Sequence, residues 1–442
     1  MRAALKSRCA VCRIIAGMVR RLGCALWVAG LPLCALAEEG AGELLERVRA
    51  RMRENLSRAP DYVCQETVER WARDSQRSEF KALDMLRLEV GFAGGKEIFS
   101  WRGASRFEEK ELADLIGSGV VGTGAFAVHA ANVFLSGAAE FTYRGEEEWK
   151  GKRSFRFDYA VPREHSRYRV RVPPYQAVVG FHGSFWVDAE TLDLLRLEVH
   201  ADEIPDELRL ARTSDVMEYQ RVTIGRSDYL LPASSEFTML GTLGNEYRNR
   251  RRLTDCRQYA AEASVRFDPG LEMAPVARAS TLPPRLVMEL VLDSSVDLET
   301  VALGDEVRAV LARPVIHQGQ LLAPQGSTVL GRLVRLEKNS MPYPHYVVGL
   351  QFDILESPAG RLEFAATLED VAPAAGLIRQ AKTLDPTFDR RRRAPRLDIL
   401  VRERQEGRGV LHWDARQPRI RRGLRMRWRT EPALSSAHRG PQ

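Results

Sequence analysis

The chain has 442 residues, with 66 Lys and Arg against 59 Asp and Glu, for a net charge of +7. This length suffices for two or three domains with well-buried cores. The charge is uneven: residues 1–37 contribute +6 and residues 374–442 contribute +11, so the body between them carries −10. An acidic body does not suit a nucleic-acid-binding protein, and any affinity for polyanions is confined to the basic tail.

Residues 1–37 are typical of a secretory signal peptide. Six basic and no acidic residues accompany an apolar run at 22–36, which ends in Ala-Leu-Ala at 35–37. This order of basic, apolar and small residues marks a cleaved leader. A membrane anchor is the alternative, although the run is shorter than the ~20 residues of a membrane span. Cys24 and Cys34 lack the small-residue context of lipidated cysteines, so we expect an exported protein, in the periplasm or associated with the outer membrane, with no transmembrane segment after the leader.

Two cysteines remain after the leader, Cys64 and Cys256. In an exported protein they are expected to form a disulfide bond, and two buried free thiols are the alternative. A bond that closes so long a loop stabilises the fold by roughly 4–5 kcal/mol in the chain-entropy model.

After the leader, the pattern predicts one helix and then a long series of strands. Residues 43–56 place Leu45, Val48 and Met52 on one stripe, as in an amphipathic helix. Alternation of apolar and polar residues then predicts strands. These strands are at residues 62–71, 85–90, 97–101, 140–143, 154–159, 168–172, 216–224, 229–240, 247–253 and 257–267.

A hairpin at residues 180–199 is the centre of this series. Phe185 and Val187 face one side and Trp186 the other, residues 188–193 have turn chemistry, and alternation resumes at Leu195. The periodicity does not say which side of the hairpin faces the core.

A helical insertion interrupts the strands. Residues 107–116 and the apolar stretch 125–135 have helical spacing, and the loop 117–124 between them is rich in glycine. We expect the second helix to act as a plug or lid. Candidate ligand-binding residues come from this helix and from the hairpin: Phe126, Val133, Phe134, Phe185, Trp186 and Val187. A core helix that permanently fills the same space is the alternative.

The leading helix, the meander and the hairpin sequence Phe-Trp-Val-Asp-Ala-Glu-Thr-Leu-Asp-Leu-Leu-Arg-Leu-Glu at 185–198 resemble the outer-membrane lipoprotein carrier family (LolA-type) and uncharacterised exported bacterial proteins of this layout. The resemblance covers about 41–267. It implies a mainly β fold with α (α+β), in which residues 38–267 form a curved antiparallel half-barrel with helices. In that family the half-barrel encloses an apolar concavity for acyl chains.

A second module is expected after a linker at 268–284, which is rich in proline and small residues. The short strands and Pro-x-Gly turn at 285–371 resemble the barrel module of TrbI-type conjugal-transfer proteins, which assembles in envelope complexes. A basic flexible linker is expected at 372–408, a strand pair at 409–430 and a disordered tail at 431–442.

No motif for catalysis, a metal or a cofactor stands out. Gly117-x-Gly119-x-x-Gly122 lacks the preceding strand of a dinucleotide fingerprint, and residues 91–96 fit a hairpin turn better than a phosphate loop. The eight histidines do not have zinc-ligand spacing. We therefore expect a non-catalytic cell-envelope protein without cofactors.

The expected ligands are lipid or lipoprotein acyl chains bound in the half-barrel. A structural component of an envelope protein complex is the alternative function. Arg390–Arg393 in the tail would contact an anionic surface, and nucleic acid is not an expected partner.

Overall fold

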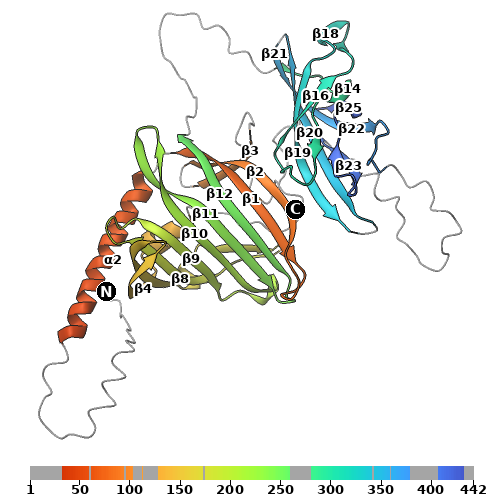
Figure 1. The fold of residues 1–442 in the computed structure, drawn as a ribbon. Helices are drawn as coiled ribbons and strands as arrows, with labels where there is room; N and C mark the ends of the chain where they lie inside the picture. The colour runs from red at the N-terminus through yellow and green to blue at the C-terminus, as the bar shows by residue number, and fades with distance from the viewer. Residues whose placement is uncertain are drawn as a thin grey trace, which may run out of the picture.

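The structure is a computed structural model that describes residues 32–58, 61–93, 96–102, 112, 128–172, 175–258, 280–340, 343–358, 360–378 and 407–432. These residues are mainly β. A large curled sheet occupies the first half of the chain, and a smaller sheet occupies the second (Figure 1). The described α-helices are α2 (Pro32–Arg58) and α4 (Val128–Leu135), and neither is long and apolar enough to cross a membrane.

The first sheet has ten antiparallel strands in the order β3-β2-β1-β12-β11-β10-β9-β8-β5-β4. Most neighbours in the sheet are also neighbours in sequence, as in a meander, and β1 next to β12 is the long-range pairing. The strands are β1 (Tyr62–Arg73), β2 (Lys81–Ala93), β3 (Lys96–Trp101), β4 (Glu140–Trp149), β5 (Lys152–Val161), β8 (Gly180–Asp188), β9 (Leu194–Asp202), β10 (Leu210–Ile224), β11 (Ser227–Gly241) and β12 (Glu246–Gln258).

The half-barrel form that we expected is present, and one local prediction was wrong. Residues 246–258 form the single strand β12, where we predicted a break near Asp255. Asp255 has a positive φ, and the ladder to β1 shifts register nearby, so a bulge absorbs the irregularity. The strand predicted at 168–172 is present as β6 (Arg169–Val172), and it pairs with β7 (Tyr175–Val178) in a separate two-stranded sheet.

Two helices cover part of the curled sheet. Val48 and Met52 of α2 are buried in the same core as Ala130, Val133 and Phe134 of α4. The apolar stripe predicted for 43–56 therefore faces the sheet. Most of the insertion, including Phe126 and the loop 117–124, lies outside the described residues.

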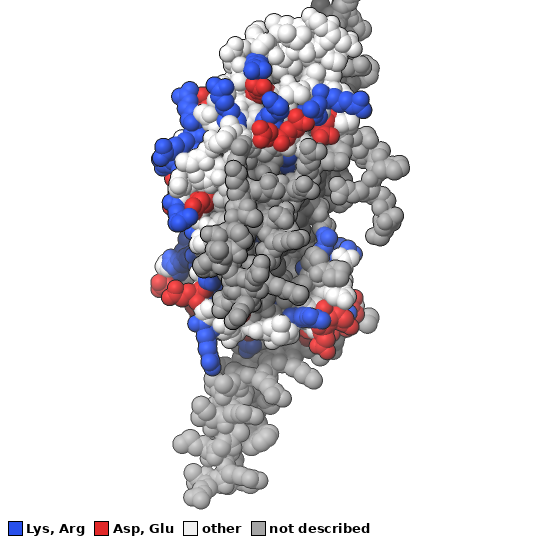
Figure 2. Space-filling view, turned by 90° about the vertical axis from the view of Figure 1, so that its right-hand side faces the viewer, with Lys and Arg blue, Asp and Glu red and all other residues white. Residues whose placement is uncertain are grey.

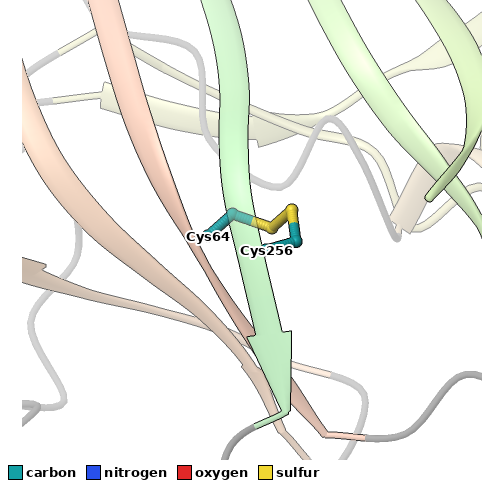
Figure 3. The surroundings of a disulfide bond; sticks show 2 residues. All are labelled: Cys64 and Cys256. Carbon is teal, nitrogen blue, oxygen red and sulfur yellow. A yellow bond between two sulfur atoms is a disulfide. The ribbon is translucent and has the colours of Figure 1, made fainter. Parts of the chain in front are cut away.

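The predicted disulfide between Cys64 and Cys256 joins β1 to β12 (Figure 3). It links residues 192 apart in sequence. The bond links β12, the last strand of this sheet in sequence, to its neighbour β1, the first.

The second half of the chain builds a nine-stranded sheet in the order β13-β21-β20-β19-β16-β14-β25-β22, with β23 paired to β20. Two small ladders, β15 with β24 and β17 with β18, accompany it. The strands are β13 (Ser280–Thr281), β14 (Val287–Leu292), β15 (Val296–Asp297), β16 (Glu306–Leu311), β17 (Val315–His317), β18 (Gln320–Ala323), β19 (Thr328–Asn339), β20 (His345–Ser357), β21 (Gly360–Glu363), β22 (Ala365–Val371), β23 (Gly409–Asp414), β24 (Arg419–Ile420) and β25 (Arg425–Glu431).

The strand pair expected at 409–430 does not form as such. β23 pairs with β20, and β25 lies between β14 and β22, so both strands belong to the second module. The reason is burial: Met426 and Trp428 alternate with exposed arginines and fill the module's core. The resemblance of this module to a TrbI-type barrel stays a prediction.

The two modules meet at the edge of the first sheet. β3 covers only the Leu88–Ala93 part of β2, and Leu303 of the second module pairs with the part that β3 leaves open. Arg87 N–H donates to the Leu303 carbonyl at 2.8 Å, and Leu303 N–H donates to the Met85 carbonyl at 2.7 Å. The second module therefore extends the first sheet through backbone hydrogen bonds.

Candidate functional site

The hairpin shows which side of the ten-stranded sheet is concave. Phe185 faces the helices, where its ring lies 5.0 Å from that of Phe134 on α4. Trp186 faces the other way, and the guanidinium of Arg196 lies 5.6 Å from its ring centroid. Because side chains alternate along a strand, this assigns each side chain of every strand in the ladder to the inner or the outer face.

One row of side chains crosses the inner face from strand to strand. Directly opposed residues of an antiparallel ladder lie on the same face, so the register gives the row without further assumptions. From β5 to β2 it reads Phe157, Phe185, Leu197, Met217, Ser235, Arg251, Val68 and Leu86. The row is apolar at the β5 end and becomes polar at β11 and β12.

The apolar half of the inner face lies under the helices. Phe157 stacks on Phe185 with ring centroids 5.1 Å apart, and Phe134 approaches Phe185 edge-on. Burial of these rings supplies most of the packing free energy here, and their edge-to-face geometry is a favourable one. This half is a continuous aromatic and aliphatic floor with α4 on top of it.

Three predicted ligand-binding residues lie on this floor or in the helix above it, and a fourth joins the same core. Val133 and Phe134 come from α4, and Phe185 and Val187 come from β8; all four are buried. They pack against the protein's own side chains. Trp186 lies on the outer face, apart from the others, and Phe126 lies outside the described residues.

The outer face carries its own cluster around Trp186. The ring of Trp149 lies 5.6 Å away, and Arg196 contacts both rings. The indole N–H of Trp186 donates to the Glu147 carboxylate. Because guanidinium groups already cover the rings of Trp149 and Trp186, we interpret this cluster as packing between surface side chains. Figure 2 shows a different face of the molecule, where basic side chains follow one edge with a few acidic side chains between them.

The polar half of the inner face is a buried ionic cluster. The guanidinium of Arg251 donates to Glu66 at 2.6 Å, and both side chains are fully shielded from solvent. Arg70 pairs with Asp84 at 2.6 Å on the same side of the sheet. Such pairs repay their desolvation only when geometry and additional hydrogen bonds are good.

Asp215 stands next to this cluster on β10. Burial raises the pKa of its carboxyl to about 7, against the lowering effect of Arg251, and Glu97 raises it further. Glu97 belongs to β3, which is five places away from β10 in the sheet order. The curl of the sheet brings the edge strand β3 close enough to β10, near the middle, for the carboxylates of Glu97 and Asp215 to interact electrostatically.

Several atoms of this polar region have no hydrogen-bond partner within bonding geometry. They are Glu66 Oε2, Asp215 Oδ1, Ser235 Oγ and Thr213 Oγ1, all fully or almost fully buried. The Thr213 hydroxyl lies close enough to Tyr168 to lower the pKa of that phenol, and the guanidinium of Arg251 supplies N–H donors to the region. The Ser235 hydroxyl lies close enough to lower the pKa of Asp215 slightly, yet its geometry is not that of a hydrogen bond. Buried polar groups in folded proteins are almost always paired, so buried oxygen atoms without a partner mark this part of the inner face as a candidate site.

The sequence reasoning missed this cluster, although a signal was present. Glu66, Val68 and Arg70 alternate on one face of β1, and Asn249, Arg251 and Leu253 do so on β12. Charged side chains at positions in register with core residues indicate a buried polar site. In β12 the signal is masked, because arginines occupy both faces of the strand.

No metal centre is found in the part of the chain that the structure describes. No three His, Cys, Asp or Glu side chains there are close enough together to hold an ion. His129 is buried in α4 with its ring 4.7 Å from that of Tyr168, and burial lowers its pKa to about 4. It is a neutral core residue at physiological pH.

No family model and no curated protein matches this chain. Among solved structures, it is similar to a domain of Vibrio parahaemolyticus described as an outer membrane lipoprotein-sorting protein, at 13% identity and a TM-score of 0.26, over 48% of this chain and 92% of that one. A LolA superfamily protein from Nitrosomonas europaea (11%, TM-score 0.27) covers 49% of this chain and 94% of its own. A DUF1329 family protein from Desulfovibrio piger (11%, TM-score 0.27) covers 51% and 97%. Scores this low leave function to be argued from the chain's own residues.

Proposed function

We propose that this chain is a non-catalytic, exported cell-envelope protein that binds the acyl chain of a lipid or lipoprotein on the inner face of its half-barrel. The observation that supports the proposal is the apolar part of the row of side chains that crosses the inner face, from Phe157 to Met217. It forms one continuous apolar strip of the kind that lines ligand sites.

The proposal assigns a mobile role to α4. This helix has eight residues, too few to be stable in isolation, so its packing on the sheet holds it in place. Phe134 occupies the position above Phe185 that an acyl chain would take. A ligand therefore binds by displacing α4 from the sheet.

Binding of a fluorescent fatty acid, cis-parinaric acid, to the full mature chain tests this proposal. Phe134→Ala removes the ring that competes with the ligand, so we expect it to bind the probe several-fold more tightly than the unaltered chain. Phe352→Ala is the matched control, because Phe352 is equally buried and makes a similar edge-on contact, with Trp428, in the second module. It should lower stability and leave probe binding unchanged.

Failure of the probe to bind either chain would contradict the proposal and favour the scaffold alternative. One feature supports that alternative. Ile316 and Leu321 are cross-strand neighbours on the β17–β18 hairpin, and both side chains are more than half exposed. An exposed apolar pair at the tip of a module is suited to contact a protein partner. Cross-linking that recovers a stable envelope protein complex, lost in Ile316→Ser, would establish it.

A further inference from the structure

We propose that the β17–β18 hairpin of the second module inserts its exposed apolar pair, Ile316 and Leu321, into the interface of a lipid bilayer. The hairpin lies outside the half-barrel, so this contact does not depend on the ligand proposed above. It gives the second module a role of its own, which is to hold the protein at a membrane surface.

The hairpin has a defined turn and an anchored base. Gln318 and Gly319 at its tip both have positive φ, +50° and +82°, as in a type I′ turn. At its base, Val315 and Ala323 are directly opposed, and both are buried in the hydrophobic core. The hairpin therefore projects from the module in a fixed orientation.

The apolar pair faces solvent from this fixed position. Ile316 and Leu321 are directly opposed across the two strands, so their side chains lie on the same face of the hairpin. Each side chain is 55% exposed. Two large aliphatic side chains held together in water form a small apolar surface that gains free energy when an apolar environment covers it.

The sequence around the pair carries no Lys, Arg, Asp or Glu from residue 314 to residue 331. At the 28% of charged residues in the whole chain, a stretch of this length would contain about five. Figure 1 places β18 at the upper end of the second module, away from the ten-stranded sheet, and Figure 2 shows that the upper end of the molecule is mostly uncharged. Charged side chains are costly to move into a bilayer, so this end of the molecule is the one suited to meet lipid.

The small size of the apolar surface favours a bilayer over a protein partner. A specific protein–protein interface buries about 800 Å² and roughly 20–30 residues on each partner. The hairpin exposes two large apolar side chains, Ile316 and Leu321, which is far less than such an interface requires. A bilayer needs no minimum area, because its interface accepts single aliphatic side chains, each in proportion to the apolar area that leaves water.

The backbone of the hairpin limits how deeply it enters the bilayer. β17 and β18 form a two-stranded ladder of their own, and open strand edges do not occur in the hydrocarbon region. In the head-group layer, water and lipid oxygens satisfy these edges and the amide side chains of Gln318 and Gln320. Two aliphatic side chains bind more weakly than a myristoyl chain, whose association constant is only about 10⁴ M⁻¹. The contact is therefore shallow and readily reversible.

Co-sedimentation of the full mature chain with phosphatidylcholine vesicles at millimolar lipid tests the proposal. The measurement is made in 0.1 M and in 1 M NaCl, between which the Debye length falls from about 10 Å to about 3 Å. We expect binding that changes less than twofold with salt, because the inserted residues are apolar. Replacing both residues, Ile316→Thr with Leu321→Thr, should lower the partition coefficient at least tenfold, since Thr keeps a preference for strands and adds a hydroxyl.

Two further variants make the assignment specific to the hairpin. Leu243→Thr is the matched control, because Leu243 is 88% exposed in the turn between β11 and β12 of the first sheet. It should leave the partition coefficient within twofold of that of the unaltered chain. Leu321→Trp should raise the coefficient at least threefold, because Trp favours the membrane–water interface. This expected gain does not arise from unfolding, and circular dichroism melts verify that each variant is folded.

Three results would overturn the membrane contact. They are no binding to vesicles, binding that 1 M NaCl abolishes, and equal partition of the unaltered chain and the double variant at Ile316 and Leu321. In the first case, cross-linking to a protein that Ile316→Ser abolishes would assign the pair to a protein partner instead. The double variant should bind cis-parinaric acid as the unaltered chain does, so failure of the acyl-binding proposal is distinguishable from failure of this one.

Discussion

At the scale of single residues, two buried titratable groups give the protein opposing responses to pH. His129 of α4 points into the apolar core, where its ring lies against Tyr168 and Phe181, and burial lowers its pKa to about 4. Asp215 sits in the polar region, and burial raises its pKa to about 7. Both groups are neutral in the folded protein between these values, where each would be charged in the unfolded chain over much of the range.

The first prediction concerns His129→Gln. Below pH 6.5 the unfolded chain binds a proton at His129 that the folded chain does not bind until about pH 4. The free energy of unfolding therefore decreases at this residue by about 1.4 kcal/mol for each pH unit as the pH falls through that window. The free energy of unfolding of the variant should therefore decrease less than that of the unaltered chain when the pH is lowered from 7 to 4.5. Urea unfolding at both pH values measures it, and exposed His165→Gln should show no such gain.

The second prediction concerns Asp215→Asn. Between about pH 4 and pH 7 the folded chain holds a proton at Asp215 that the unfolded chain has lost, so stability falls as the pH rises through this window. The amide of Asn does not titrate, so the variant does not lose this stability as the pH rises. We expect the free energy of unfolding at pH 8 to rise by roughly 2–4 kcal/mol, with little change at pH 4. A variant less stable than the unaltered chain at pH 8 would show that Asp215 is instead a favourable ionic partner of Arg251.

At the scale of elements, the contact between the modules depends on one short turn. Leu303 pairs with the open edge of β2, and Gly304 follows with φ of +92°. A Cβ atom at Gly304 would lie 2.3 Å from the Arg87 carbonyl oxygen and 2.7 Å from the Trp101 ring. The Arg87–Asp305 ion pair flanks the turn and is partly exposed, so it adds little. The close backbone approach is the part that requires glycine.

The third prediction follows from a matched pair of glycines. Gly423 also has φ of +92°, but a Cβ there would meet nothing within 4 Å. Gly423→Ala therefore measures backbone strain alone, which is of the order of 1 kcal/mol. Gly304→Ala adds the clash and should destabilise the protein by at least about 2 kcal/mol more, with the single unfolding transition in urea separating into two. Equal effects of the two substitutions would show that the turn does not hold the modules together.

At the scale of the whole molecule, one covalent bond reinforces the long-range pairing of the half-barrel. Cys64 and Cys256 join β1 and β12, which are the first and last strands of the ten-stranded sheet in sequence and neighbours within it, so the loop that the bond closes contains most of the other strands. The core of the second module is continuous with residues of β1 and β2 near this bond. Opening the bond loosens the place where both modules meet.

The fourth prediction is that Cys64→Ser with Cys256→Ser lowers the free energy of unfolding by roughly 4–5 kcal/mol, because the unfolded chain regains the entropy of a long loop. Reduction of the unaltered chain with dithiothreitol should have a similar effect in guanidinium unfolding. An unchanged midpoint after verified reduction would mean that strand pairing alone sets the stability of this junction.

Alternation in the sequence was enough to predict most strands of the curled sheet, the amphipathic helix and the pairing of the two remaining cysteines. These features depend on local patterns: the two-residue period of strands, the 3.6-residue period of helices and the number of cysteines. The two modules and the approximate strands of the second one also follow from local pattern. The partners of β23 and β25 do not, because any strand with one apolar face can fill any free edge.

Only the tertiary structure decided which face of the sheet packs against the helices. Phe185, Trp186 and Val187 are consecutive apolar residues, so alternation places Phe185 and Trp186 on opposite faces without saying which is inside. The buried ionic cluster was equally impossible to predict, since Glu66 and Arg251 are 185 residues apart and meet only because β12 pairs with β1. The alternation of side chains along a strand follows from local backbone geometry, whereas a buried ion pair depends on which distant strands the fold brings side by side.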